Sequence, residues 1–217
     1  EDIFMKKPIF TGSGVALVTP MNADGSINYT KLGELVDFHL ANQTDAIVAC
    51  ATTGESPVLT HEEHCKAIEF VINRVNHKIP VIASTGSNDT AYAVELCKEA
   101  QQAGADGFLM VTPYYNKTSQ RGLVKHYHYV ADHVDLPIIL YNVPSRTGLN
   151  IKPETYVELA KHPNINATKE ANGNISAIAK TVALCGDELN LYSGDDDQTY
   201  SMMALGGKGV ISVLANV

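Results

Sequence analysis

Residues 81–111, VIASTGSNDTAYAVELCKEAQQAGADGFLMV, contain the pattern from which the fold is predicted. The stretch begins with a short apolar run, 81–84, continues through a segment of helical period, 91–103, and ends in a second apolar run, 107–111. Runs that are apolar throughout, without alternation, are typical of strands covered on both faces. Residues 88–90 have side chains that can cap the intervening helix. The stretch therefore predicts two buried, parallel strands joined by a helix.

The same pattern recurs from one end of the chain to the other. We expect strands at 15–19, 46–50, 81–84, 107–111, 138–141, 165–169, 189–193 and 209–213. Helical segments between them are expected at 32–41, 62–75, 91–103, 122–133, 155–161 and 175–184. Eight strands alternating with helices predict an α/β fold, a parallel (βα)8 TIM barrel. The open dinucleotide-binding sheet is disfavoured, since no G-x-G-x-x-G follows the first strand.

The chain ends at Val217, directly after the eighth expected strand. A typical barrel of this kind has about 250 residues. We therefore expect residues 1–217 to form a single (βα)8 barrel domain, apparently truncated after the eighth strand. The final helix and any C-terminal helical extension would then be lacking.

Composition excludes several classes of function. A formal charge of −8 argues against binding to nucleic acid. No apolar run approaches the roughly 18 residues of a membrane span, and residues 1–8 have no apolar core like that of a signal peptide. The four cysteines are scattered and form no C-x-x-C pattern, which favours a reduced, cytoplasmic protein with thiols in its core.

Active-site groups of a barrel lie at the carboxyl ends of its strands, and there this chain has hydroxyls, one lysine and one arginine. Lys169 ends the sixth strand. Alone, such a lysine is also typical of a snorkelling surface residue. In a barrel mouth, desolvation favours the neutral amine, which can attack a ketone to give an iminium. Tyr141, at the end of the fifth strand, could shuttle a proton or be a core-edge tyrosine with a satisfied hydroxyl.

Two further segments are candidates for binding carboxylates. Thr52 and Thr53 precede Gly54, and their hydroxyls with the nearby amides could hold a small carboxylate, although a plain turn fits as well. Arg146 lies in a loop after the fifth strand, where its planar guanidinium suits a second carboxylate. A surface salt bridge is the alternative for Arg146.

Motifs for metals and phosphates are not convincing. His61 and His64 are spaced at i, i+3 instead of the i, i+4 of the zinc motif. Gly206–Gly209 lacks the framing of a P-loop and is followed by no helix. Asp195–Asp197 is acidic enough for a metal, but it also suits the first turn of a helix, which we prefer. We therefore predict no metal site.

Six motifs, in this order, resemble one known family. They are TTGES (Thr52–Ser56), TPYYN (Thr112–Asn116), YNVPSRTG (Tyr141–Gly148), KEA (Lys169–Ala171), SGDD (Ser193–Asp196) and GVISV (Gly209–Val213). From Phe10 to Val217 the sequence resembles the dihydrodipicolinate synthase family of the N-acetylneuraminate lyase superfamily. Any one motif alone would be weak, but the combination is highly specific.

The resemblance implies roles for the catalytic candidates. Lys169 would form a Schiff base with pyruvate, and Tyr141 would donate and accept protons. Thr52 and Tyr115 would complete a proton relay. The family draws the tyrosine at the position of Tyr115 from a neighbouring subunit, which implies a homo-oligomer, usually a dimer of dimers.

The resemblance also implies the reaction. Thr53 and the backbone at Ile211 would hold the pyruvate carboxylate, and Arg146 would receive the carboxylate of L-aspartate 4-semialdehyde. Their condensation would give 4-hydroxy-tetrahydrodipicolinate, the committed step towards diaminopimelate and lysine. No metal or organic cofactor is expected, because the Schiff base is itself the electron sink. The alternatives are another pyruvate-dependent aldolase or lyase, acting on N-acetylneuraminate or a keto-sugar acid, and a non-catalytic sensor on the same fold.

The sequence departs from the family pattern at a few positions. Ala51 replaces a glycine, which matters if a positive φ is needed there, and Thr168 replaces isoleucine or valine. In members inhibited by lysine, the inhibitor binds at positions that match Ser56, Pro57, His61, His64, Asn88, Tyr92 and Tyr114. Because Tyr92 stands in place of a glutamate and Pro57 in place of an alanine, we expect weak or absent inhibition by lysine.

Overall fold

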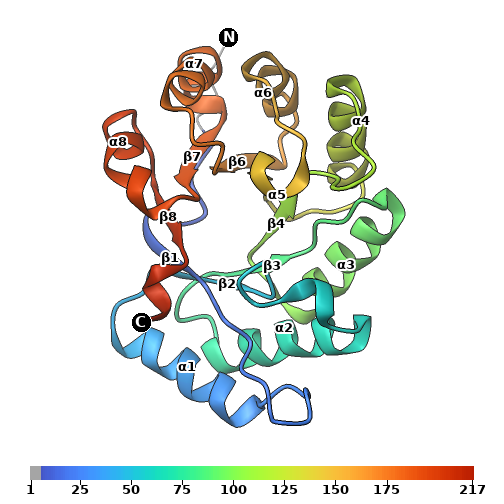
Figure 1. Cartoon of the computed structure of the whole chain (residues 1–217), viewed down its shortest axis with the longest axis vertical. Coiled ribbons are helices and arrows are strands. Elements are labelled where there is room, and N and C mark those ends of the chain that lie inside the picture. The colour runs from blue at the N-terminus through green and yellow to red at the C-terminus, as the bar shows by residue number, and fades with distance from the viewer. Residues whose placement is uncertain (1–5) are drawn as a thin grey trace.

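A computed structural model describes residues 6–217 and places eight parallel strands in a closed barrel. Each strand pairs with the next in sequence, and β8 pairs with β1, so the order is β1 to β8 around the ring (Figure 1). The (βα)8 prediction is thereby confirmed. The strands are β1 Gly12–Ala16, β2 Ala46–Ala49, β3 Val81–Ser84, β4 Gly107–Val111, β5 Ile138–Asn142, β6 Ile165–Glu170, β7 Asn190–Ser193 and β8 Gly209–Ser212.

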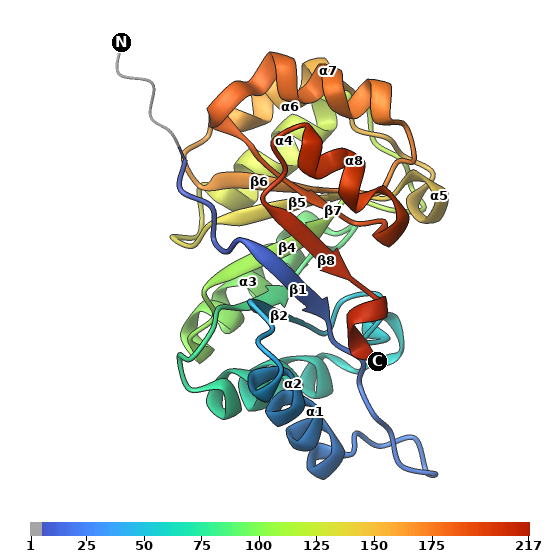
Figure 2. The ribbon, with the colours of Figure 1, turned by 90° about the vertical axis from the view of Figure 1, so that its left-hand side faces the viewer.

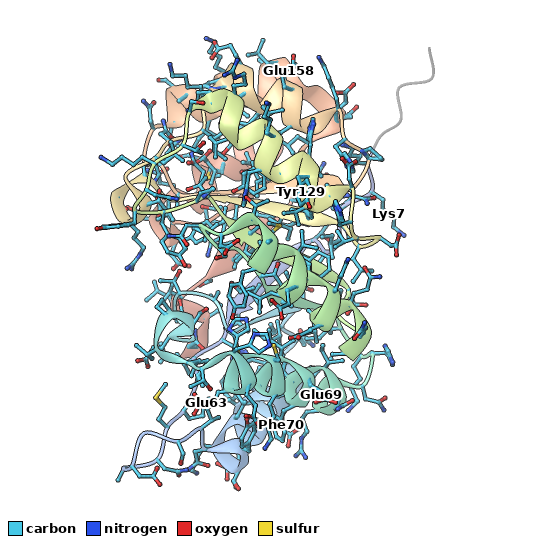
Figure 3. All side chains as sticks on the ribbon, turned by 90° about the vertical axis from the view of Figure 1, so that its right-hand side faces the viewer. Lys7, Glu63, Glu69, Phe70, Tyr129 and Glu158 are labelled. Carbon is cyan, nitrogen blue, oxygen red and sulfur yellow. The ribbon has the colours of Figure 1, made fainter. Side chains whose placement is uncertain are left out.

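Helices follow the strands and surround the barrel (Figure 1). Their charged side chains, such as Glu69 and Glu158, lie on the outer helices (Figure 3). No helix within residues 6–217 is long and apolar enough to cross a membrane. The helices are α1 Tyr29–Ala41, α2 His61–Val75, α3 Thr90–Ala103, α4 Gln120–Ala131, α5 Pro144–Thr147, α6 Pro153–Ala160, α7 Ile175–Cys185 and α8 Thr199–Ala204, with short 3₁₀ turns η1 Ser56–Val58, η2 Gly186–Glu188, η3 Asp196–Gln198 and η4 Leu214–Asn216.

The predicted position of the first strand was wrong by three residues. β1 begins at Gly12, because its register is set by pairing with β8, which lies beside it in Figure 2. A Cβ at Gly12 would lie 2.1 Å from a carboxylate oxygen of Asp45, and a Cβ at Gly14 would lie 2.8 Å from the Phe10 ring. Close packing therefore requires glycines here, and glycines carry no apolar signal by which a strand is recognised.

Side-chain caps begin both α2 and α3. Thr60 accepts from the backbone N–H of Glu63, whose carboxylate accepts from the backbone N–H of Thr60, so a capping box begins α2. Within the stretch 88–90, Asp89 is the residue that caps α3. The acidic run after β7 forms the short turn η3, which leads directly into α8. This agrees with the helix start predicted for the run.

The core has two layers, and this positions the site. One set of strand side chains, including Ala167, Ile139 and Ile211, fills the interior of the barrel. The alternate set, including Met110 and Leu140, packs against the helices. Both faces of each strand are thus buried. A polar side chain that follows the pattern of the inner set must enter the barrel interior.

Candidate active site

Lys169 lies on the inner face of β6, two residues beyond Ala167, and its side chain is 3% exposed. Its Nζ stands over the Tyr141 ring, 4.2 Å from the ring centroid, because the two residues are paired between β5 and β6. Nζ forms no hydrogen bond or ion pair within residues 6–217. A Cβ at Gly194 would lie 3.1 Å from the Lys169 Cε, so the glycine gives the lysine chain its room.

Burial lowers the pKa of the Lys169 ammonium to about 8. Asp195 and Asp196 act in the opposite sense, and Arg146 lowers the pKa further. The ordinary value for lysine is about 10.4. A much larger fraction of Lys169 is therefore a neutral amine near neutral pH, which is the form that attacks a carbonyl.

Tyr141 is buried at the end of β5. Burial raises the pKa of its phenol, Asp195 raises it too, and Arg146 lowers it. Its hydroxyl forms no hydrogen bond within residues 6–217. The side chain is thus a protonated phenol beside the amine, with its donor unused. This is the arrangement required of a group that passes protons to a bound substrate.

A cavity of about 460 Å³ opens beside Tyr141, and Thr52 and Arg146 also line it. Lys169 does not line this cavity. Its Nζ lies over the ring of Tyr141, which does line it. The volume is in the range of small-molecule sites. Three of the predicted residues from three different elements or loops thus meet at one mouth.

The turn that carries Thr52 is held close to β1. Thr19 Oγ1 donates to the carbonyl of Gly54 at 2.7 Å, and a Cβ at Gly54 would lie 3.0 Å from the carbonyl oxygen of Leu17. Glycine is therefore needed for this approach. The positive φ values around the turn fall at Cys50, at 52°, and at Glu55, at 57°, and Ala51 is not among the residues with positive φ. The substitution at Ala51 thus places no strain on the turn.

Arg146 lies in the single-turn helix α5, which Gly148 ends with a φ of 70°. Its side chain is exposed at the mouth of the cavity. No ion pair of its guanidinium occurs within residues 6–217. The alternative of a surface salt bridge is therefore not realised in the described chain, and the fork remains available to an anion.

The remaining predicted residues lie outside this wall. Tyr115 is 89% exposed, has a φ of 72° and does not line the chain's own cavity. Ile211 is fully buried on β8, where it pairs with Gly14. Thr53 is half-buried beside Thr52 but does not line the cavity.

Sequence reasoning missed Glu170, the next residue on β6, which is also buried. Its carboxylate accepts from the Tyr156 hydroxyl at 2.8 Å and from Nδ2 of Asn142 at 2.9 Å. Thr168 in turn donates to the Tyr156 hydroxyl at 3.1 Å. Burial raises the pKa of Glu170 to about 7. The available signal for this network was an acidic residue directly after a strand that was expected to be buried.

Most positions matched to lysine binding lie on the wall of the same cavity, namely Ser56, Pro57, His64, Tyr92 and Tyr114. The other two adjoin it. Nδ1 of His61 is 3.1 Å from the Tyr92 hydroxyl, and Nδ2 of Asn88 donates to the carbonyl of Tyr114 at 3.3 Å.

Comparison with known proteins shows which proteins this chain is similar to. The sequence model described as the dihydrodipicolinate synthetase family matches residues 9–217. The 4-hydroxy-tetrahydrodipicolinate synthase of Caldicellulosiruptor saccharolyticus is 57% identical over 210 residues, 97% of this chain and 71% of that protein. The crystal structure of dihydrodipicolinate synthase from Aquifex aeolicus superposes with a TM-score of 0.93 at 52% identity, covering 96% of this chain and 71% of that one.

A third relative carries a ligand in its description. It is the chloride-inhibited dihydrodipicolinate synthase from Acinetobacter baumannii, described as complexed with pyruvate. It is 46% identical, with a TM-score of 0.94, and the match covers 95% of this chain and 71% of that chain. The similarity first seen in the six motifs therefore covers most of the chain and includes its fold.

Proposed function

The chain belongs to the dihydrodipicolinate synthetase family, and we propose that Lys169 is its nucleophile. The reaction is the condensation of pyruvate with L-aspartate 4-semialdehyde to 4-hydroxy-tetrahydrodipicolinate. One observation carries the assignment of Lys169: it is a buried amine with a lowered pKa and no hydrogen bond within residues 6–217, beside the cavity. A structural lysine would instead be paired or reach solvent.

The proposed first half-reaction loads pyruvate onto the lysine. The neutral Lys169 amine attacks the ketone carbon, and the carbinolamine loses water to give an iminium. The iminium withdraws electrons from the neighbouring methyl group, so a C3 proton leaves and an enamine forms. We assign these proton transfers to Tyr141, whose protonated phenol lies against the amine: it donates its proton to the departing hydroxide, and the phenolate so formed accepts the C3 proton.

The second half-reaction joins the two substrates. The enamine carbon attacks the aldehyde of the semialdehyde, whose oxygen takes up a proton. The amine of the condensed product then attacks the iminium carbon and displaces Lys169, closing a six-membered ring. The electron pair left by the C3 proton is taken up by the iminium, so the proposed cycle uses no metal or organic cofactor.

We propose separate binding residues for the carboxylate of each substrate. Thr53 and the backbone at Ile211 hold that of pyruvate. Arg146 holds that of the semialdehyde, because its guanidinium is at the mouth of the cavity and has no ion-pair partner in the described part of the chain. A neutral sugar aldehyde would give this cation no counter-ion, and the sugar-lyase alternative is disfavoured for that reason.

The proposed relay requires a second copy of the chain. Tyr115 is 89% exposed and does not line its own cavity. We propose that it enters the site of a neighbouring subunit beside Thr52, within a homo-oligomer. The only other partners proposed are the two small substrates, and the proposed location is the cytoplasm.

The direct test of function is turnover with a panel of aldehydes. Pyruvate is incubated with the full-length protein and either L-aspartate 4-semialdehyde or an uncharged sugar aldehyde, and products are identified by mass spectrometry. We expect kcat/KM for the semialdehyde to be at least about tenfold higher, since one charge-assisted pair is worth about 1.5–3 kcal/mol. Faster turnover of the sugar aldehyde, or none of any aldehyde, would refute the assignment.

A further inference from the structure

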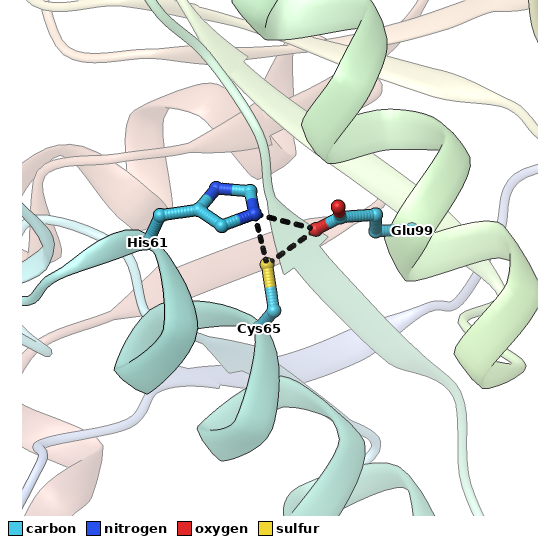
Figure 4. Close-up of side chains that lie close together, drawn as sticks. All are labelled: His61, Cys65 and Glu99. Carbon is cyan, nitrogen blue, oxygen red and sulfur yellow. Dashed lines mark hydrogen bonds and ion pairs between the residues drawn. The ribbon is translucent and has the colours of Figure 1, made fainter.

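A second cluster of reactive side chains lies on the outside of the barrel, between α2 and α3. His61 and Cys65 are four residues apart on α2 and so share one face of the helix. Glu99 reaches them from α3. Figure 4 shows the three side chains converging: Nε2 of His61 is 3.2 Å from Oε2 of Glu99, and Sγ of Cys65 is 2.7 Å from the same oxygen and 4.0 Å from Nε2.

These spacings fit a metal ion at the centre of the cluster. Zinc binds imidazole, thiolate and carboxylate at about 2.0–2.3 Å in tetrahedral geometry, which sets ligand atoms roughly 3.3–3.6 Å apart. The three observed distances bracket that range, so changes of less than about 1 Å in each would complete the site. A nitrogen, a sulfur and an oxygen donor together suit Zn²⁺ better than Mg²⁺ or Ca²⁺.

A further residue orients the imidazole as metal sites require. Nδ1 of His61 lies 3.1 Å from the hydroxyl of Tyr92. Because a phenol oxygen can accept as well as donate, it can accept a hydrogen bond from Nδ1–H, which leaves the lone pair of Nε2 to the ion. Such a partner for the second ring nitrogen is the usual companion of a ligating histidine.

The cluster is accessible. The side chains of His61 and Glu99 are 42% and 37% exposed, and a surface groove passes over all three residues. Glu62 and Glu69, together with the cation Lys66, also line the groove. An ion can therefore enter, and water can fill the fourth coordination position.

We propose that His61, Cys65 and Glu99 form a Zn²⁺ site that clamps α2 to α3, outside the catalytic cavity. Binding forms a zinc–sulfur bond and releases the Cys65 thiol proton to solvent. None of the three ligands lines the catalytic cavity, but Tyr92 lines it and also holds His61. By holding His61, the ion thus restrains Tyr92, which lines the cavity, from the outer side of the barrel.

The test is metal binding by the intact protein after treatment with a chelator. Titration with ZnCl₂ should give one bound ion per chain. Co²⁺ in its place should produce a thiolate-to-cobalt absorption band in the near ultraviolet, which reports the Cys65 bond directly. Because loss of even an outer partner costs about 10–100-fold in affinity, Cys65→Ser and Glu99→Gln should each weaken Zn²⁺ binding at least about tenfold. Cys65→Ser should also abolish the band.

Matched variants separate this site from other thiols. Cys185 lies on α7, on the opposite side of the barrel from α2, so Cys185→Ser should leave the band and the affinity unchanged (Figure 1). Tyr92→Phe should weaken binding but keep the band. The proposal is overturned if the intact protein shows no band, if Cys65→Ser retains it, or if Cys185→Ser removes it.

Discussion

Lys169 and Glu170 are neighbours on β6, both almost fully buried, and they lie in opposite surroundings. Lys169 enters the barrel interior, where its amine lies over the Tyr141 ring and forms no hydrogen bond within residues 6–217. Glu170 faces the helices, where Tyr156 and Asn142 donate to its two oxygens. Burial shifts both pKa values, down for the lysine and up for the glutamate.

The difference shows that a shifted pKa alone does not identify a catalytic group. Each carboxylate oxygen of Glu170 accepts a hydrogen bond from a neighbour, so the carboxylate joins β6 to β5 and α6. Lys169 has no hydrogen-bond or ion-pair partner among the residues that the structure describes, and it lies beside a cavity. Burial without partners is costly, and it is retained where the free group has chemistry to perform.

The largest expected effect is that substitution of Lys169 abolishes turnover, whereas substitution of Glu170 lowers stability. Lys169→Ala should lower kcat by at least about a thousandfold, because it removes the nucleophile, with little change in the midpoint of thermal unfolding. Glu170→Ala should do the opposite, since two buried donors lose their acceptor at about 1–3 kcal/mol each. Turnover and thermal unfolding of both variants test this.

Two controls accompany that pair. Lys180→Ala removes a surface lysine that pairs with Glu154, and it should change neither quantity. Glu170→Gln keeps an acceptor and should recover most of the stability lost in Glu170→Ala. If Lys169→Ala unfolded the protein and Glu170→Ala only lost activity, the comparison would be inverted.

Arg146 should separate the two substrates. Arg146→Ala should lower kcat/KM for the semialdehyde at least about tenfold, at about 1.5–3 kcal/mol for a charge-assisted pair, and leave iminium formation with pyruvate much less affected. Arg74→Ala, which breaks a surface pair with Asp37, is the matched control. Equal loss of both steps would show that Arg146 has a structural role.

The two neighbours should also differ in their dependence on pH. Iminium formation should rise with pH and level off above about 8, because it needs the neutral form of Lys169. Asp195 raises that pKa, so Asp195→Asn should move the midpoint to lower pH. Rates of adduct formation measured across pH test this, and a midpoint that stays near the ordinary lysine value would contradict it.

The pKa of Glu170 is raised in the folded state, so the folded protein holds a proton that the unfolded chain has released. Stability should therefore fall as pH rises from about 4.5 to about 7. Glu170→Gln should flatten that part of the profile, as measured by denaturant unfolding at each pH.

The smallest expected effect concerns lysine. Tyr92 is a neutral phenol, and burial raises its pKa further, so it offers no countercharge to an ammonium group. Loss of a charged hydrogen bond costs about 1.5–3 kcal/mol, or roughly 10- to 150-fold in affinity, of which cation–π contact can restore about 0.5–2 kcal/mol. Lysine should inhibit weakly or not at all, and Tyr92→Glu should strengthen inhibition. Half-inhibition of the unchanged protein at micromolar lysine would contradict this.

Much of the barrel was predictable, because strands buried on both faces leave continuous apolar runs such as 107–111. The first strand was misplaced because close packing replaces its side chains with glycine at Gly12 and Gly14. Lys169 and Tyr141 were identifiable from their places at strand ends. Their contact depends on the register of β5 and β6, which no single segment encodes.

The clusters between helices were harder to foresee. His61 and His64 were compared with each other as metal ligands because they are close in sequence. The structure turns His64 to the carbonyl of Ser84 and brings His61 to Cys65 and Glu99. The thiols were expected in the core, yet Cys65 is only half-buried. Packing of α2 against α3 decides these contacts, and sequence spacing does not record it.

The central claim is that Lys169, and no other lysine, forms a bond with pyruvate. The protein is incubated with pyruvate and borohydride, digested, and its peptides are weighed by mass spectrometry. The account predicts one reduced pyruvate adduct, on the peptide that contains Lys169, and its complete loss in Lys169→Ala. An adduct on a different lysine, or no adduct at all, would contradict the account.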